Sequence, residues 1–222
     1  MPDMSFEPQA CLFDLDGVIV DTAKYHFTGW QRLADELGIP FTHEDNEQLK
    51  GVSRVGSLEY ILHKGGLDLD NDTKVRLMDR KNGWYLNLVS AMTPDELFPG
   101  VVEFIDELRA LGIKVGLGSS SRNAPLILDR CGISDRFDTI VDGNSITFSK
   151  PDPEVFLKGA EAFGVDPERC VVFEDAQSGV EAALNGGFRI VGVGDAKALD
   201  RAEFVISGFD GFNVEALIAR LS

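Results

Sequence analysis

The sequence predicts an α/β fold in which a Rossmann-like parallel sheet carries an inserted helical cap domain. One observation is the alternation after Pro94, where short apolar segments take turns with helix-length amphipathic ones. Such alternation is typical of a parallel sheet with helices on both faces. The other observation is the stretch of residues 22–91, which has helical periodicity and no convincing strand. We therefore expect a core domain of residues 1–21 and 92–222 and a cap domain of residues 22–91.

In chain order, the apolar run of residues 9–15 predicts a buried strand that ends in acidic residues. From Thr22, apolar residues recur at helical spacing until Gly38 provides a natural helix end. The rest of the cap predicts helices over residues 43–49, 57–63 and 72–89. The core then predicts helices over residues 99–111, 125–131, 153–163, 178–185 and 214–221, and strands over residues 114–118, 139–141, 170–173, 190–193 and 204–206.

Composition and charge narrow the class of protein. The 222 residues are 44% hydrophobic and 26% charged, as in globular proteins. A formal net charge of -16 argues against nucleic acid binding, which needs clustered Lys and Arg. No segment has the length of a membrane span, and the scattered Cys11, Cys131 and Cys170 fit buried thiols in a reducing compartment. We expect a soluble cytoplasmic monomer that binds a small molecule and neither nucleic acid nor membrane.

Two carboxylates stand one residue apart where the first predicted strand ends. Asp14 and Asp16 would leave an extended segment on the same side, because side chains in a strand repeat with period two. Like charges this close persist when a cation or a proton lies between them. The spacing alone leaves three alternatives open. They are a metal site, an acid/base pair and a solvated turn, since Asp and Gly are ordinary turn residues.

Polar residues follow four segments of the predicted sheet, and parallel strands bring their carboxyl ends to one edge, where ligands bind. These residues are Asp14 with Asp16, Ser119 to Asn123, Lys150, and Glu174 with Asp175. Carboxylate oxygens suit a hard cation, and Mg²⁺ needs only a few of them beside its waters. We therefore expect one Mg²⁺ per chain, held by Asp14, Asp16, Glu174 and Asp175.

The same edge offers hydrogen-bond donors and a cation for a phosphoryl group. Ser119, Ser120 and Ser121 supply hydroxyls and backbone N–H groups ahead of a helix, and Lys150 supplies a point charge. Combined with the carboxylates, these groups predict phosphoryl transfer through a carboxylate nucleophile. We expect Asp14 to be the nucleophile and Asp16 to be the general acid and base.

The motifs of the core resemble those of the haloacid dehalogenase superfamily, in the right order and across nearly the whole chain. They are Asp14-Leu15-Asp16-Gly17-Val18, the Ser119 loop, Lys150-Pro151 and Glu174-Asp175. Within the superfamily the chain is most similar to the β-phosphoglucomutases, through strings in the predicted cap that span residues 21–27, 46–54 and 80–82. The resemblance implies a haloacid dehalogenase-like core with an α-helical cap.

The resemblance implies that Asp14 becomes an aspartyl phosphate. β-Glucose 1-phosphate and glucose 6-phosphate would then interconvert through β-glucose 1,6-bisphosphate, which acts as intermediate and activator. The resemblance also implies that Ser119, the Ser120 amide and Lys150 bind the phosphate near the metal. It further implies that the Asp16 backbone carbonyl is a ligand of Mg²⁺. For the distant phosphate of the sugar it implies four groups, which are Arg54, Ser121, Arg122 and Asn123.

The resemblance further implies that the cap closes over the sheet edge and that Asp16 reaches its catalytic position only in the closed state. Thr22 and His26, in the hinge region, would orient Asp16. The other candidates for substrate contacts are Trp30, Leu49, Lys50, Gly51, Val52, Ser57 and Lys81. For Trp30 the helical stripe favours packing in the core of the cap instead.

The chain departs from the family pattern at Ser120 and Arg122, where the compared proteins have a small apolar residue and Lys. A backbone amide and a cation are still present at those positions, so the implied function is kept. Two rival functions stay open. One is a phosphatase of the same fold that hydrolyses phosphoglycolate or a hexose phosphate. The other is a non-enzymatic phospho-acceptor module, because receiver domains also place carboxylates around Mg²⁺ at strand ends.

Overall fold

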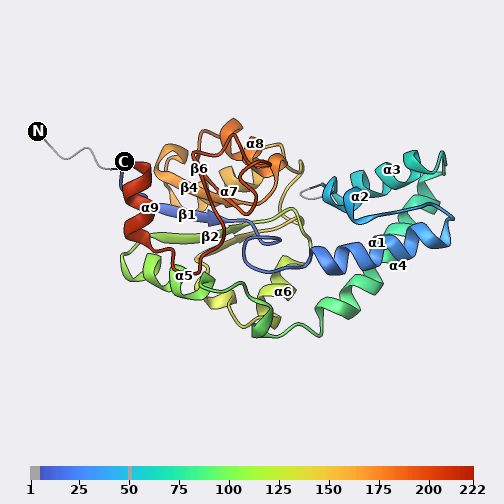
Figure 1. Cartoon of the computed structure of the whole chain (residues 1–222), viewed down its shortest axis with the longest axis horizontal. Helices are drawn as coiled ribbons and strands as arrows, with labels where there is room; N and C mark the ends of the chain where they lie inside the picture. The colour runs from blue at the N-terminus through green and yellow to red at the C-terminus, as the bar shows by residue number, and fades with distance from the viewer. Residues whose placement is uncertain (1–5, 50–51) are drawn as a thin grey trace, which may run out of the picture.

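The computed structural model describes residues 6–49 and 52–222, and its sheet has the predicted parallel topology. Within these residues six strands form one sheet in the order β3-β2-β1-β4-β5-β6 (Figure 1), and all neighbouring strands are parallel. The fold class predicted from the sequence is confirmed. The strands are β1 Ala10–Phe13, β2 Lys114–Gly118, β3 Thr139–Val141, β4 Cys170–Glu174, β5 Arg189–Val193 and β6 Phe204–Ile206.

Helices cover both faces of the sheet. Helices α5, α6 and α9 pack on the face that presents Phe13 and Phe173, whereas α7 and α8 pack on the face that presents Leu12 and Val172. The layers are visible in Figure 1, with α7 and α8 above the strands and α5 and α6 below them. The bounds are α5 Val101–Ala110, α6 Ala124–Arg130, α7 Glu154–Phe163, α8 Gln177–Asn185 and α9 Val214–Leu221.

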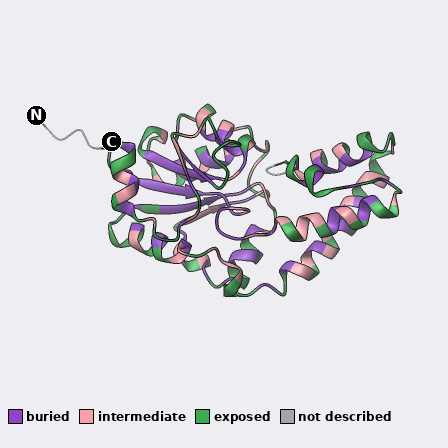
Figure 2. Cartoon of the chain, viewed as in Figure 1, coloured by how far each residue is buried: buried purple, intermediate pink, exposed green. Residues whose placement is uncertain are grey.

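Strand β1 lies at the centre because both of its faces are apolar. Ala10 and Leu12 belong to one hydrophobic cluster and Cys11 and Phe13 to the other, as the period of two in a strand requires. The Phe13 ring stacks on the ring of Phe173 in β4, with 4.7 Å between the ring centroids. Figure 2 shows the central strands buried along their length. This burial holds the end of β1, and the acidic loop after it, between β2 and β4.

The cap is a four-helix unit with a hydrophobic core of its own. Its helices are α1 Ala23–Glu36, α2 His43–Glu47, α3 Arg54–Lys64 and α4 Asn71–Val89. Trp30 and Leu33 of α1, Ile61 of α3 and Leu77 of α4 are buried in one cluster that is separate from the two clusters of the sheet. Figure 1 shows these helices at the end of the sheet opposite α9.

One cap helix begins earlier than the pattern of apolar residues predicts. Helix α3 starts at Arg54 and not at residue 57, because the Ser53 hydroxyl accepts a hydrogen bond from the Gly56 backbone N–H at 3.2 Å. Ser, Thr, Asn and Asp are preferred at this position because their side chains satisfy backbone donors that the first turn leaves free. The earlier start places Arg54 on a helix, where its side chain has a defined direction.

Two linkers join the cap to the core, and they pair with each other. Val20 forms an antiparallel bridge with Leu97, and the Phe98 backbone N–H donates to the Ile19 carbonyl at 3.0 Å. Glu96 accepts hydrogen bonds from Lys24 at 2.6 Å and from the Tyr25 hydroxyl at 2.7 Å. We propose these linkers as the boundaries of the two domains.

The environment of the cysteines agrees with the prediction from their spacing. Cys11, Cys131 and Cys170 are all buried and none forms a disulfide. Burial raises the pKa of the Cys131 thiol to about 11, which keeps it protonated and unreactive. Among residues 6–49 and 52–222, no helix has the length and apolar character needed to cross a bilayer.

Candidate active site

The candidate active site lies where the sheet order reverses direction. Chain order takes β2 and β3 to one side of β1, and β4, β5 and β6 to the other. At such a switch point the loops after the two neighbouring strands diverge and leave room for a ligand. Asp14 follows β1, and its backbone N–H donates to the Phe173 carbonyl of β4 at 3.0 Å. The ends of β1 and β4 are therefore held side by side.

Three carboxylates meet at this point. Oxygen atoms of Asp14, Glu174 and Asp175 lie within 4.8 Å of one another. Asp14 and Glu174 are buried, and Asp175 is half-buried. The side chain of Asp16 is not part of this group, so its share in a metal site through the backbone carbonyl stays a prediction. A partly buried set of oxygen ligands is what a hard divalent cation such as Mg²⁺ prefers, and the residues present fit that ion.

Lys150 lies between two of the carboxylates. Its Nζ is 2.5 Å from Asp14 Oδ1 and 2.6 Å from Glu174 Oε1, and its side chain is almost fully buried. Burial alone would lower the pKa of Lys150, but the Asp14 and Glu174 charges outweigh it and hold the pKa above its usual value. Lys150 is therefore a permanent cation beside Asp14, in the position to contact a phosphoryl group bound there.

The pKa of Glu174 depends on effects that oppose one another. Burial raises the pKa of its carboxyl, the neighbouring Asp14 raises it further, and Lys150 opposes both. Its Oε2 also accepts a hydrogen bond from the Ala176 backbone N–H at 2.9 Å, at the start of α8. Each oxygen of Glu174 thus has a partner in the protein, which fixes the orientation of the carboxylate at the edge of the site.

Gly17 allows the acidic loop to approach Asp175 closely. Its φ is +81°, a conformation that L side chains rarely adopt, and a Cβ there would lie 2.1 Å from Asp175 Oδ2. The Gly17 backbone N–H donates to the Val20 carbonyl at 2.8 Å, which closes the turn after Asp16. No other residue type would let the loop after β1 and the loop after β4 share this space.

Asp16 has the properties of a proton donor. Its Oδ1 is buried and has no hydrogen-bond partner among the described residues. Burial, with a further contribution from the Asp14 charge, raises the pKa of Asp16 to about 8. A carboxyl group with such a pKa is protonated near neutral pH, so it can give a proton to a leaving oxygen.

Lys81 and His26 face each other inside the cap. Lys81 Nζ lies 2.9 Å from His26 Nδ1 and above the rings of Trp30 and Tyr85, at 4.5 and 4.8 Å from their centroids. Burial, reinforced by the nearby Arg54, lowers the pKa of Lys81 to about 7, while the charge of Asp16 opposes the shift. Burial also lowers the pKa of His26, with Lys81 as the next cause. Lys81 therefore lies within electrostatic range of Asp16.

The Ser119 loop is ordered by its own hydroxyls. The Ser119 hydroxyl accepts from the Ser121 backbone N–H at 3.1 Å, and the Ser121 hydroxyl accepts from the Asn123 backbone N–H at 3.3 Å. Ser119 is buried after β2, next to β1, and its backbone N–H donates to the Val141 carbonyl. The predicted phosphate loop therefore stands beside Asp14 with a fixed backbone. The buried hydroxyl of Ser120 has no hydrogen-bond partner within the described part of the chain.

A second group of donors spans the cap and the core. Arg54 Nη2 donates to Asn82 Oδ1 at 2.8 Å, and Asn123 Nδ2 donates to the same oxygen at 3.1 Å. Burial lowers the pKa of the Arg54 guanidinium, and the charge of Arg122 lowers it further. Two guanidinium groups that repel each other in this way favour the binding of an anion between them. Asn82 has no role predicted from the sequence, although it stands beside Lys81 in a motif that carries the resemblance.

The remaining candidates occupy different environments. Trp30, Leu49 and Ser57 are buried in the cap, and the first two lie in its hydrophobic core. This agrees with the packing that the helical stripe favours for Trp30. Val52 is exposed, and Thr22 is fully buried just before α1. Lys50 and Gly51 lie outside the described residues. Sugar contacts by these residues stay predictions.

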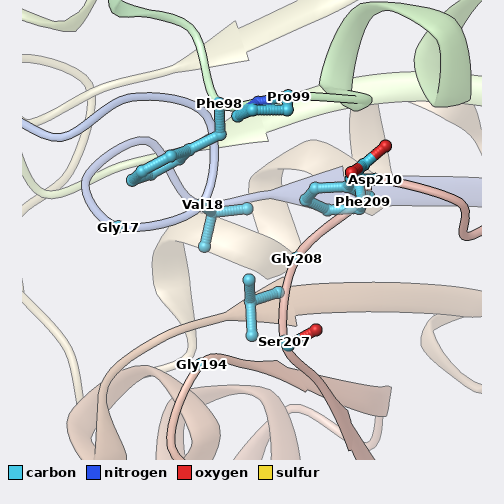
Figure 3. A pocket seen from close by; sticks show the side chains of 10 residues that line it. Gly17, Val18, Phe98, Pro99, Gly194, Ser207, Gly208, Phe209 and Asp210 are labelled. Carbon is cyan, nitrogen blue, oxygen red and sulfur yellow. The ribbon is translucent and has the colours of Figure 1, made fainter.

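A cavity lies beside Gly17 and Val18 of the acidic loop (Figure 3). Its volume is about 390 Å³, and it is lined by Gly17 and Val18 of the loop, Phe98 of the second linker and residues 207–210 after β6. None of the three clustered carboxylates lines it. The cavity is therefore distinct from the candidate metal site, although both share the loop after β1.

Substitution of Gly179 tests whether the position of the Glu174 carboxylate matters for stability and for Mg²⁺ binding. A Cβ on Gly179 in α8 would lie 1.7 Å from Glu174 Oε1, so Gly179→Ala must push that carboxylate away from Lys150. We expect a loss of stability of about 1 to 3 kcal/mol and weaker Mg²⁺ binding. Thermal unfolding with and without Mg²⁺ measures both effects. The matched control is Gly83→Ala in α4, where a Cβ meets nothing within 4 Å and should stabilise the protein slightly. Equal behaviour of the two variants would contradict the proposed role of Glu174.

Comparison with known proteins agrees with this geometry. Residues 8–187 match the family of haloacid dehalogenase-like hydrolases. The chain is 44% identical over 211 residues to a β-phosphoglucomutase of Bacillus subtilis (strain 168), covering 94% of this chain and 93% of that protein. It is also 34% identical over 199 residues to a phosphorylated carbohydrates phosphatase of Thermotoga maritima, covering 86% of this chain and 89% of that protein.

A solved structure extends the similarity to three dimensions. The crystal structure of a β-phosphoglucomutase from Clostridium difficile superposes with a TM-score of 0.93 at 37% identity, covering 96% of this chain and 97% of that one. Similarity at this level covers the sheet and the inserted cap together. The chain therefore belongs to the haloacid dehalogenase-like hydrolase family and, within it, to the branch of the β-phosphoglucomutases.

Proposed function

We propose that the protein is a Mg²⁺-dependent β-phosphoglucomutase that interconverts β-glucose 1-phosphate and glucose 6-phosphate through β-glucose 1,6-bisphosphate. The observation that carries the proposal is a second group of hydrogen-bond donors and cations, in addition to the group beside Asp14. Lys150 contacts Asp14, and the Ser119 loop follows the neighbouring strand β2, whereas Arg54 lies within electrostatic range of Arg122 and shares Asn82 with Asn123. An enzyme that moves a phosphoryl group between two ends of one sugar needs a second site for the phosphate that does not react.

Asp14 is the proposed nucleophile. One of its carboxylate oxygens attacks phosphorus, the bond between phosphorus and the sugar oxygen breaks, and the oxygen receives a proton from Asp16. The resulting aspartyl phosphate passes its phosphoryl group to the free hydroxyl of a glucose monophosphate, which forms β-glucose 1,6-bisphosphate, and Asp16 takes up the proton of that hydroxyl. The bisphosphate then gives its other phosphoryl group back to Asp14, and the second glucose monophosphate is released. The raised pKa of Asp16 supports this double role, because its carboxyl both holds and releases a proton near neutral pH.

The main electrostatic requirement of the reaction is to stabilise the negative charge on the phosphoryl group. Lys150 supplies one positive charge, and Ser119 and the Ser120 amide supply hydrogen-bond donors. Asp14, Glu174 and Asp175, with the Asp16 carbonyl, would hold Mg²⁺, which when bound neutralises further charge on the phosphoryl oxygens. The fixed geometry of these residues means that little reorganisation is needed as charge develops.

Closure of the cap protects the aspartyl phosphate from water. Arg54 belongs to the cap and Arg122 to the core, so a sugar phosphate that binds both draws the domains together. Thr22 and His26 lie at the start of α1, next to the linker that carries Asp16. We propose that they orient Asp16 when the cap closes, and that the exposed Val52 then contacts the sugar.

The rival candidate is a hexose phosphate phosphatase, which the similarity to the Thermotoga maritima phosphatase supports. The signalling alternative lacks such support, since a non-enzymatic module needs neither a cap nor a second anion site. Mutase and phosphatase share the steps up to the aspartyl phosphate. They differ in whether a sugar hydroxyl or water accepts the phosphoryl group.

A coupled assay separates the two. With Mg²⁺, a catalytic amount of β-glucose 1,6-bisphosphate and either anomer of glucose 1-phosphate, we expect glucose 6-phosphate to form from the β anomer with little free phosphate. Omission of the bisphosphate should produce a lag, and chelation of Mg²⁺ should stop the reaction. Stoichiometric release of phosphate without isomerisation would show that the protein is a phosphatase.

A further inference from the structure

Asn82 joins the two domains through a single oxygen atom. Its Oδ1 accepts hydrogen bonds from Arg54 Nη2 in α3 and from Asn123 Nδ2 at the start of α6. Asn82 itself lies on α4, so the contact links two cap helices to a core helix. Both donors belong to the set proposed for the distant phosphate. One side-chain carbonyl therefore occupies the place of a shared acceptor, which is the role that a phosphate oxygen would take.

The charge of the surroundings makes a neutral acceptor important. The Arg54 guanidinium is partly withdrawn from water, and burial together with Arg122 lowers its pKa. A partly buried cation needs a hydrogen-bond acceptor. An amide oxygen meets this need and carries no net charge, whereas a carboxylate would form an ion pair with Arg54 and compete with the incoming phosphate. The side chain at position 82 thus satisfies the cation and leaves it available for an anion.

We propose that Asn82 is a positioning residue that assembles the distant-phosphate site before the substrate binds. It holds Arg54 of the cap and Asn123 of the core at one point, so the substrate meets two oriented donors and not two mobile side chains. Ordering these groups in advance lowers the cost of binding. Since an amide is a weaker acceptor than phosphate, the substrate displaces it and takes over both donors. This inference rests on the proposed function, because it concerns the substrate phosphate that does not react.

The test compares two substitutions at position 82, one that removes the acceptor and one that keeps the shape of Asn. Asn82→Ala removes the shared acceptor, and we expect the Kd of glucose 6-phosphate and the KM of the mutase reaction to rise about tenfold. Asn82→Asp keeps an oxygen in place but adds a negative charge, and we expect a rise of about a hundredfold. The matched control is Asn87→Ala, an exposed position on the same helix, which should bind glucose 6-phosphate like the wild type.

A small substrate separates positioning from a general defect. Acetyl phosphate carries no distant phosphate, so its hydrolysis should fall much less than mutase kcat/KM in Asn82→Ala. In an Arg54→Ala background, Asn82→Ala should have little further effect on glucose 6-phosphate binding, because the two residues act as one unit.

Three results would overturn this inference alone. They are wild-type affinity for glucose 6-phosphate in Asn82→Ala or Asn82→Asp, equal losses toward acetyl phosphate and the hexose phosphate in Asn82→Ala, and additive effects of Asn82→Ala and Arg54→Ala. A wild-type protein that does not bind glucose 6-phosphate overturns the proposed function, and the inference with it.

Discussion

Asp14→Asn is expected to abolish the acid-labile phosphoenzyme and to lower turnover by more than roughly a thousandfold. The amide has the shape of the carboxylate but lacks the nucleophilic oxygen that would attack phosphorus. The fold should persist, because Lys150 keeps its ion pair with Glu174 and the backbone N–H of residue 14 still bonds to β4. Incubation with radiolabelled β-glucose 1,6-bisphosphate, followed by an acid quench, measures the covalent phosphate.

The matched control for this substitution is Asp16→Asn. The side chain of Asp16 is not part of the carboxylate cluster. The Asp16→Asn variant should therefore still accept phosphate on Asp14, although slowly, because only proton transfer is lost. The two variants therefore separate the nucleophile from the acid/base group. Retention of the covalent label in Asp14→Asn, with its loss in Asp16→Asn, would reverse the roles assigned to the two residues.

Lys150→Met is expected to lower turnover by roughly a hundredfold to a thousandfold and to destabilise the protein by about 3 to 5 kcal/mol. Methionine fills the space of the lysine stem but leaves Asp14 and Glu174 as two buried carboxylates without their shared cation. Mg²⁺ can supply the missing positive charge, so the melting temperature of the variant should rise with Mg²⁺ more than that of the wild type. Thermal unfolding over a Mg²⁺ titration measures this difference.

Lys158→Met provides the control for removing a lysine. Lys158 is half-exposed on α7 and pairs with Glu154 four residues before it, a type of ion pair that contributes little. Its loss should change stability by less than about 1 kcal/mol and should not alter the response to Mg²⁺. If Lys150→Met unfolds at the wild-type temperature and responds to Mg²⁺ no more strongly, Lys150 does not neutralise the carboxylate pair.

Much of the fold could be predicted because local patterns and tertiary packing agree. The bounds of β2, β3, β6 and α9 match the predicted ranges to the residue, and each of these segments is a short apolar or amphipathic run between clear turn residues. The largest difference at the start of a helix is in α3, which begins at Arg54 and not at residue 57. Its first turn depends on the Ser53 cap and has few buried residues, so the apolar pattern alone begins too late.

The core of the site could be predicted for a related reason. Once four strand ends belong to one parallel sheet, topology brings the residues after them to one edge, whatever their distance in sequence. Asp14, Glu174 and Lys150 meet in this way across as many as 160 residues. What the pattern does not contain is the pairing inside the group, such as Lys150 shared between two carboxylates, because that depends on side-chain directions after folding.

The contacts of the cap were not predictable from the sequence alone. Lys81 faces His26 because α4 packs against α1, and Asn82 reaches Asn123 because α4 also passes close to α6. Each contact depends on how two helices cross, which periodicity in one helix does not determine. The resemblance to the β-phosphoglucomutases pointed to the motif that contains both residues but gave a role only to Lys81.

The bridge between Val20 and Leu97 limits how the cap can move. Two independent tethers would allow it to slide and twist in several directions, but a paired ribbon favours bending about one axis. Asp16 is itself bridged to Val20, four residues along the same ribbon. Any bend of that ribbon therefore changes the backbone that carries the proton donor. We therefore expect closure of the cap to move Asp16 with it, so that this carboxyl group reaches the substrate only when the sugar is enclosed.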